Sequence, residues 1–207
     1  MGPMECYNAL LAQKVTGELG KRNMEGTYCK TKEDALKKVL EMIPKESLAS
    51  CGGSATLNEI GLKDALRTKG YNFMDPNDAQ GAAAKDEAAH RALAAEYFLT
   101  GCNAIAATGE LVNMDGYGNR VAPIIFGPKH VIVVAGINKV APSLDAAIER
   151  AKTIAAPLIL LRFKQDYASY DELMQAAEGA CSQTVITRFS TMKGRIKVIL
   201  VGEELGY

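Results

Sequence analysis

The chain has 207 residues, of which 48% are hydrophobic, and its 24 Lys and Arg balance 24 Asp and Glu. This length and composition are typical of one globular α/β domain, and the lack of a basic excess argues against a nucleic-acid partner. No apolar run approaches the roughly 18 residues of a membrane helix. The opening MGPMECYNALLAQK lacks the basic start and long apolar block of a signal peptide. We therefore expect a cytoplasmic protein with no membrane span.

The cysteines argue against a metal or cluster site within this chain. All five are far apart, and no CxxC pair occurs. Zinc and iron–sulfur sites usually draw on closely spaced ligand pairs. We therefore expect free thiols, no metal and no bound cofactor.

The first half of the sequence alternates between helical and extended patterns. Residues 4–22 have helical spacing, and we expect residues 1–24 to form an N-terminal helical arm before a domain over residues 25–207. Strands are predicted over 25–30, 48–53 and 71–75, and helices over 31–42 and 54–70. The strand–helix–strand order indicates a parallel sheet.

The second half opens with an alanine-rich stretch that predicts a helix over residues 82–98. After it the pattern changes to short segments rich in Val and Ile, which predict a run of adjacent strands: 103–108, 109–114, 120–126 and 130–136. A helix should open at Pro142 and be kinked or ended by Pro157. A late buried strand is expected over residues 195–202.

Residues 51–61, CGGSATLNEIG, place two glycines between a predicted strand and a predicted helix. Free N–H groups at a helix start favour anions, and the hydroxyls of Ser54 and Thr56 add donors. We therefore take Gly52, Gly53, Ser54 and Thr56 as candidate anion-binding residues. An ordinary alternative is that Ser54 caps the helix and Glu59 is a solvated acid of its first turn.

Residues 113–120, NMDGYGNR, combine turn residues with an acid and a base. A turn explains the glycines and the amides, but it explains Arg120 less well, because that residue opens an apolar segment. A guanidinium there should snorkel to solvent, pair with Asp115, or bind a carboxylate or phosphate. The candidate ligand-binding residues of this segment are Gly116, Asn119 and Arg120.

Residues 126–140 contain a predicted buried strand that ends at Gly136, Asn138 and Lys139. In parallel sheets, ligands collect at the carboxyl ends of the strands. These three residues are therefore candidates for the same binding cleft. The alternative is a loop with an exposed lysine, which is common on protein surfaces.

These segments together resemble the LUD family, the lactate-utilisation domain formerly catalogued as a domain of unknown function. The residues that carry the resemblance are 94–140, the upstream GGSATLNEIGL at 52–62 and the tail GRIKVILVGEELGY at 194–207. The resemblance covers the chain from about residue 5 onward. It departs from many small LUD proteins in the segment 180–198, which keeps Cys181 but not the other cysteines of their insert.

The resemblance implies a three-layer α/β/α fold with a central, mostly parallel sheet, shared with coenzyme A transferases, ribose-5-phosphate isomerase and glucosamine-6-phosphate deaminase. Family members similar to lactate-utilisation protein C work beside an iron–sulfur system that oxidises L-lactate to pyruvate. The resemblance therefore implies a role in lactate utilisation, as an enzyme or as a subunit beside iron–sulfur subunits. A homodimer is compatible with this fold.

Three functional hypotheses follow. In the first, an enzyme or enzyme subunit binds a small anionic metabolite, with Arg120 as a carboxylate clamp oriented by Asp115 and with Glu59 as acid/base or nucleophile. In the second, the chain is a non-catalytic subunit of an iron–sulfur oxidoreductase complex. In the third, it is a coenzyme A transferase-like or sugar-phosphate isomerase-like enzyme, which needs a catalytic acid in the cleft. Glu59 and Asp115 are the candidate catalytic residues.

Overall fold

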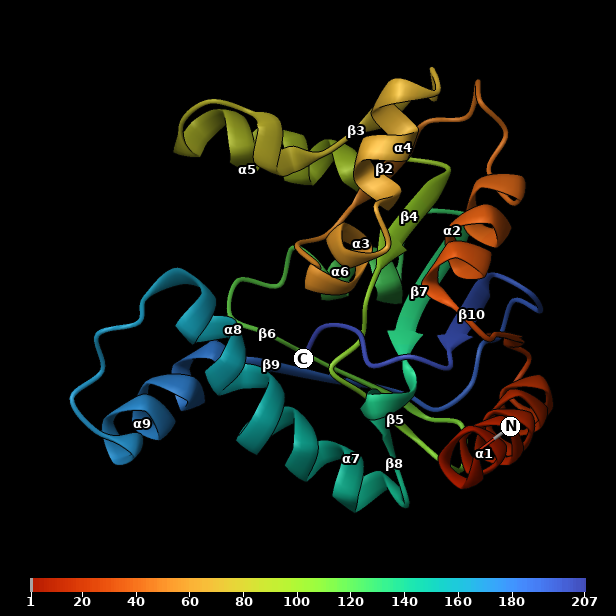
Figure 1. Cartoon of the computed structure of the whole chain (residues 1–207). Coiled ribbons are helices and arrows are strands. Elements are labelled where there is room, and N and C mark those ends of the chain that lie inside the picture. Colours follow the sequence, from red (N-terminus) through yellow and green to blue (C-terminus); the bar gives the residue numbers. More distant parts are fainter. Residues whose placement is uncertain (1) are drawn as a thin grey trace.

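The computed structural model describes residues 2–207 and is built on a six-stranded parallel sheet. The strand order is β1-β10-β7-β4-β2-β3, and every neighbouring pair runs parallel (Figure 1). The strands are β1 (Glu25–Cys29), β2 (Ala49–Cys51), β3 (Phe73–Met74), β4 (Tyr97–Thr100), β7 (His130–Gly136) and β10 (Ile196–Val201). The late strand expected over 195–202 is confirmed as β10, and it lies between β1 and β7.

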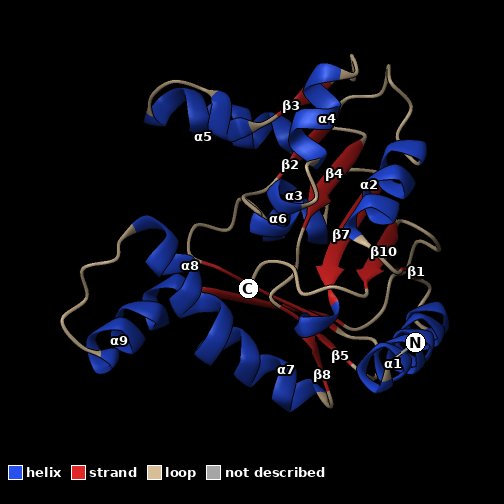
Figure 2. Ribbon diagram, in the orientation of Figure 1, coloured by secondary structure: helices blue, strands red, loops and turns tan. Residues whose placement is uncertain are grey.

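Helices cover both faces of this sheet, so three layers form (Figure 2). On β7, Val131 and Val133 face one core while Ile132 and Val134 face the other, as the alternation of side chains along a strand requires. The first face is covered by α1 (Pro3–Lys21), α5 (Ala82–Ala92) and α6 (Val121–Ile125), and the second by α2 (Lys32–Glu41), α3 (Ala55–Glu59) and α4 (Leu62–Thr68). The expected α/β fold with a central parallel sheet is confirmed.

A second, four-stranded sheet lies beside the first, in the order β8-β5-β6-β9. Its strands are β5 (Ala104–Ala106), β6 (Leu111–Asp115), β8 (Val140–Ala141) and β9 (Gln183–Thr187). The adjoining helices are α7 (Leu144–Arg150), α8 (Ala156–Phe163) and α9 (Tyr170–Ala180), and a single π-helical turn joins α7 to α8. The run of adjacent strands predicted between residues 103 and 136 is therefore divided between two sheets.

The alanine-rich helix is shorter than the sequence predicts. Helix α5 ends at Ala92, and residues 97–100 form β4 between β7 and β2. The local composition of residues 94–96 continues the helical pattern, whereas the backbone amides of Glu96 and Tyr97 bond to the carbonyl of Leu48 in the neighbouring segment. Tertiary pairing overrides the local propensity here.

The strand predicted over residues 120–126 is wrong, because Val121–Ile125 form the short helix α6. Both carboxylate oxygens of Asp115 are close to this helix start, and Oδ2 accepts hydrogen bonds from the amides of Arg120 and Val121 at 3.0 and 2.9 Å. Pro123 stands in the first turn, where a missing N–H costs nothing. This cap, from a side chain six residues before Val121, outweighs the strand propensity of Val121 and its apolar neighbours.

Pro157 does not end the helix after Pro142. It occupies the first turn of α8, and the preceding π-helical turn, Ala151–Ala155, absorbs the change in backbone geometry. None of the described helices combines the length and the apolar composition that crossing a bilayer requires.

Candidate functional site

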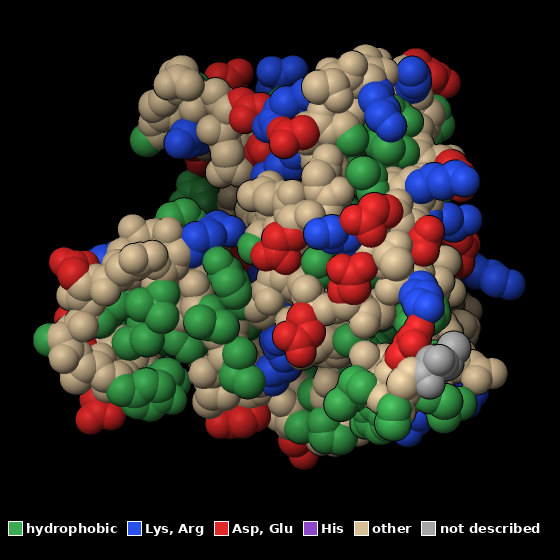
Figure 3. All heavy atoms as spheres, viewed as in Figure 1, with side chains coloured by type: hydrophobic (Ala, Val, Ile, Leu, Met, Phe, Trp, Pro, Cys, Tyr) green, Lys and Arg blue, Asp and Glu red, His purple; other side chains and the backbone are tan. Residues whose placement is uncertain are grey.

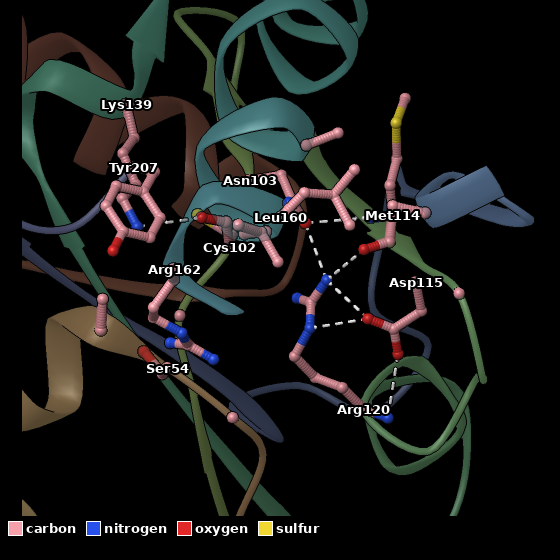
Figure 4. Close-up of a pocket in the computed structure, with 17 residues that line it drawn as sticks. Ser54, Cys102, Asn103, Met114, Asp115, Arg120, Lys139, Leu160, Arg162 and Tyr207 are labelled. Carbon is pink, nitrogen blue, oxygen red and sulfur yellow. Dashed lines mark hydrogen bonds and ion pairs between the residues drawn. The ribbon is translucent and has the colours of Figure 1, made fainter. Parts of the chain in front are cut away.

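The carboxyl ends of three neighbouring strands, β2, β4 and β7, open onto a cavity of about 350 Å³. The second sheet and helix α8 form its opposite wall (Figure 4). The polar and charged residues that line it are Ser54, Asn103, Asp115, Arg120, Lys139, Arg162 and Tyr207. Convergence at strand ends is the behaviour expected of parallel α/β sheets.

The loop after β2 brings Gly53 and Ser54 to the cavity. The Ser54 hydroxyl accepts a hydrogen bond from the amide of Leu57 at 3.3 Å, so the expected N-cap is present. Gly52 allows the loop to approach Arg120 closely, since a Cβ there would lie 2.9 Å from Arg120 Cγ. The loop is therefore packed against Arg120, which lies between β6 and α6.

Lys139 lies in the turn after β7 and is 4% exposed. Its Nζ donates to the Thr56 hydroxyl at 2.9 Å and to the carbonyl of Cys102 at 3.2 Å. No carboxylate lies within 4.0 Å of this ammonium in residues 2–207. Burial lowers the pKa of Lys139 to about 8, and the nearby cations Arg150 and Arg120 add to the effect. The alternative of an exposed loop lysine is excluded.

Arg120 and Asp115 form a buried pair at the other end of the cavity. Arg120 Nε donates to Asp115 Oδ1 at 2.9 Å, Nη1 donates to Asn113, and Nη2 donates to Asn103 and to the carbonyl of Met114. Four of the five N–H groups of a guanidinium are thus used within the protein. Both Asp115 oxygens accept hydrogen bonds from the Arg120–Val121 segment. This is the pairing that the sequence offered as an alternative to ligand binding.

Three predicted site residues hold the segment after β10 rather than line the cavity. Glu59 Oε2 accepts from the amide of Gly206 at 2.7 Å, and Asn138 Oδ1 accepts from the amide of Leu205 at 3.1 Å. A Cβ on Gly136 would overlap the backbone nitrogen of Leu205. Together these contacts place Tyr207 beside Lys139 in the cavity wall (Figure 4).

The structure also adds residues that sequence reasoning missed. Arg162 of α8 is exposed, lines the cavity and makes no salt bridge with a described residue. Asn103 lies after β4, which was hidden in the predicted helix, and its Oδ1 accepts from Arg120 and from the amide of Met114. Arg150 donates to the carbonyls of Asn103 and Asn138 and so fixes two strand-end loops. No local motif identifies Arg162, because α8 is far from the glycine-rich loops in sequence.

The cavity thus brings together half of the predicted residues: Gly53, Ser54, Asp115, Gly116, Arg120 and Lys139. Two further predicted residues contact these lining residues without lining the cavity: Gly52 packs against Arg120, and Thr56 accepts a hydrogen bond from Lys139. Asn119 is exposed and lies outside this cavity, on a separate surface hollow beside α5. Glu59, Gly136 and Asn138 act on the segment 205–206 as described above.

The electrostatic balance of the cavity is positive. Lys139, Arg120 and Arg162 line it, and among the described residues Asp115 is the one acidic side chain that does. Asp115 is already paired with Arg120, which leaves Lys139 and Arg162 without an acidic partner. On the outer face in Figure 3, by contrast, basic and acidic side chains are interspersed. A cavity with excess positive charge attracts small anions.

Comparison with known proteins places this chain in a family. The chain matches the LUD domain model over residues 12–201. It is similar over 96% of its length to 98% of a DUF162-family protein of Deinococcus radiodurans, with a TM-score of 0.55 and 13% identity, which supports the same fold. Two partial likenesses have lower TM-scores. One is a D-ribose-5-phosphate isomerase in complex with phospho-erythronic acid, at 0.39 with 16% identity over 55% of this chain and 54% of that chain.

The other partial likeness is eIF2B delta of Chaetomium thermophilum, at 0.35 with 16% identity over 69% of this chain and 57% of that chain. No curated protein sequence matches the chain. The family match runs from the middle of α1 to the end of β10 and so spans both sheets and every wall of the cavity except Tyr207. The chain belongs to the LUD domain family.

Proposed function

We propose that this protein binds a small carboxylate metabolite in the cavity between its two sheets, as an enzyme or subunit in the oxidation of L-lactate to pyruvate. Membership of the LUD family supports a role related to lactate utilisation in general. The observation that carries the finer proposal is Lys139, a buried lysine that faces the cavity with no acidic partner among the described residues.

An unpaired buried ammonium is costly, so proteins retain one chiefly where it serves a ligand. A bound carboxylate would supply the missing counter-charge and accept a hydrogen bond from Lys139. Lys63 shows the ordinary solution elsewhere in this fold, because its ammonium is buried but lies 2.8 Å from Asp75. Lys139 thus lines a cavity where Lys63 has a carboxylate partner.

Arg162 is the second ligand-binding candidate. Its guanidinium lies near the β2–α3 loop, 3.9 Å from where a Cβ on Gly53 would stand. In Figure 4 it lies between Lys139 with Tyr207 at one end and Arg120 with Asp115 at the other. A guanidinium with free N–H groups is suited to bidentate binding of a carboxylate.

Arg120 takes a different role from the clamp expected from sequence. Only one of its N–H groups stays free, so we assign it to holding the loop after β6 and to the positive potential of the cavity. Asp115 correspondingly positions Arg120 and caps α6. The isomerase-like or transferase-like alternative needs a free acid in the cleft, and Glu59 instead binds the amide of Gly206 outside it.

Isothermal titration calorimetry tests the proposal with L-lactate, pyruvate and the uncharged analogue L-lactamide. The wild-type chain should bind the two anions and not the amide. Replacing Arg162 by Ala or Lys139 by Met should weaken binding by about 10- to 100-fold each, since a hydrogen bond to a charged group contributes about 1.5–3 kcal/mol.

Arg188→Ala is the matched control, because Arg188 is also exposed but lies outside the cavity. It should leave affinity unchanged. Equal affinities in all four proteins, with native circular dichroism spectra, would refute the assignment of this cavity as the anion site. Co-purification with iron–sulfur subunits is the companion measurement for a role as a subunit.

A further inference from the structure

The hydrogen bonding of Lys139 bears on its chemistry as well as its charge. Nζ has two acceptors in the protein, Thr56 Oγ1 at 2.9 Å and the carbonyl oxygen of Cys102 at 3.2 Å. A neutral amine has two N–H groups and one lone pair. Two acceptors therefore satisfy a neutral Lys139 fully and leave its lone pair without a partner in the protein, in a residue that lines the cavity.

The surroundings increase the neutral fraction of Lys139. Lys139 is 4% exposed, and its burial is the main cause of the lowered pKa; the cations Arg150 and Arg120 lower it further, whereas Glu59, which is not within 4.0 Å, partly offsets them. With a pKa of about 8 in place of the ordinary 10.5, the neutral fraction at about pH 7 is about 300-fold larger than for an exposed lysine. Thr56 is itself oriented, because its hydroxyl lies 3.4 Å from the carbonyl of Leu205 as well as 2.9 Å from Nζ.

We propose that Lys139 is an amine nucleophile that forms an imine with a small oxo acid bound in the cavity. The inference rests on the proposed function, which supplies a carboxylate ligand, and it narrows the ligand class to compounds with a carbonyl group beside the carboxylate. Arg162 would hold the carboxylate of such a ligand while its carbonyl carbon meets Nζ. Neutral lysines in desolvated pockets perform this addition in general.

The step is balanced without an oxidant or reductant. The Nζ lone pair forms a bond to the carbonyl carbon, and the π electrons of C=O move to oxygen, which takes a proton as nitrogen loses one. The resulting hydroxyl takes up a second proton from water and leaves as water when the nitrogen lone pair forms the C=N bond, and the remaining N–H proton returns to water to give the neutral imine. Hydrolysis reverses both stages, so the adduct is in equilibrium with free ligand and free lysine.

Reductive trapping tests this inference. The full chain is incubated with pyruvate and sodium borohydride, digested, and analysed by mass spectrometry for a reduced pyruvate adduct on each lysine. We expect the adduct on Lys139 to exceed that on Lys164 by at least about tenfold at neutral pH, because Lys164 has a side chain that is 55% exposed. Lys63 should stay unmodified, since it is buried and paired with Asp75.

Two variants separate the possible causes. Lys139→Arg keeps a positive charge but has no nucleophilic amine, so it should form no adduct at any pyruvate concentration, whatever affinity for pyruvate calorimetry gives. Arg162→Ala keeps the amine but lacks the carboxylate partner, so it should need a higher pyruvate concentration for half-maximal labelling. The lysine comparison within the wild-type chain stands even if a variant fails to fold.

Each outcome decides between the two proposals. Selective labelling of Lys139 supports the imine. Pyruvate binding without an adduct, or labelling that is equal at Lys139 and Lys164, overturns the imine and leaves the anion site in place. No binding and no labelling overturns both.

Discussion

Arg120 illustrates how one residue can serve structure and site together. Its side chain crosses between the sheets, touching Asn103 after β4 and Asn113 on β6, and its own amide is capped by Asp115. The Arg120 and Asp115 side chains are each 11% exposed. Removing one partner of such a pair leaves an uncompensated charge, which is the costly case. The pair therefore anchors one wall of the cavity.

Asp115→Ala should lower the free energy of unfolding by about 3 kcal/mol, because it unpairs Arg120 and removes the cap of α6. Urea denaturation followed by circular dichroism measures this. Asp166→Ala is the control: its side chain is 81% exposed and 3.8 Å from Lys164, so the change should stay below about 0.5 kcal/mol. Equal effects of the two substitutions would show that the buried pair contributes little.

At the scale of elements, two glycines of this chain differ in whether there is space for a side chain. Gly17 lies within α1, four residues before its last residue, where an added Cβ would meet nothing within 4 Å. Gly136 ends β7 with ordinary extended dihedrals, φ −70° and ψ 156°, so its backbone would accept any residue. Space is the constraint there, since a Cβ would overlap the backbone of Leu205 and of Glu203.

Gly17→Ala should raise the free energy of unfolding by about 0.5–1 kcal/mol, because alanine loses less backbone entropy in a helix. Gly136→Ala should lower it by about 1–3 kcal/mol, the usual cost of overpacking, and should displace the segment that carries Tyr207. Thermal or urea unfolding of both variants gives the comparison. A stabilised Gly136→Ala protein would contradict the close approach of β7 to that segment.

At the scale of the whole molecule, the notable feature is a lysine buried where the two sheets meet. Its folded pKa of about 8 lies below the ordinary 10.5, so between these values the unfolded chain binds a proton that the folded chain does not. Stability must then rise with pH across this window. Below about pH 8 Lys139 is protonated in the folded chain as well. Burial of this charge then lowers the free energy of unfolding by about 3 kcal/mol, the value that corresponds to the pKa difference.

Lys139→Met removes that cost. The variant should therefore have a higher free energy of unfolding than wild type at low pH. This gain in stability should be about 3 kcal/mol larger at about pH 7 than at about pH 10.5. Urea denaturation of both proteins at the two pH values isolates this titration, because the other groups are common to both. A difference that does not change with pH would mean that Lys139 titrates as an exposed lysine does.

Local sequence was sufficient for the elements whose pattern agrees with their tertiary surroundings. The continuous apolar run of β7, the apolar strand β10 and the capped start of α2 at Thr31 are formed where they were expected. The glycine-serine loop and the end of β7 also meet at one sheet edge, because adjacent parallel strands bring their carboxyl ends together. Family membership likewise follows from the linear order of these segments.

Tertiary structure alone decided the remaining features. Residues 97–100 become a strand because they pair with β2 and β7. The structure adds Arg162 to the residues that line the cavity and removes Glu59 from them. Both changes depend on contacts between segments more than a hundred residues apart, such as that of Glu59 with Gly206. Such contacts depend on how complete layers pack, and short windows of sequence do not contain that information.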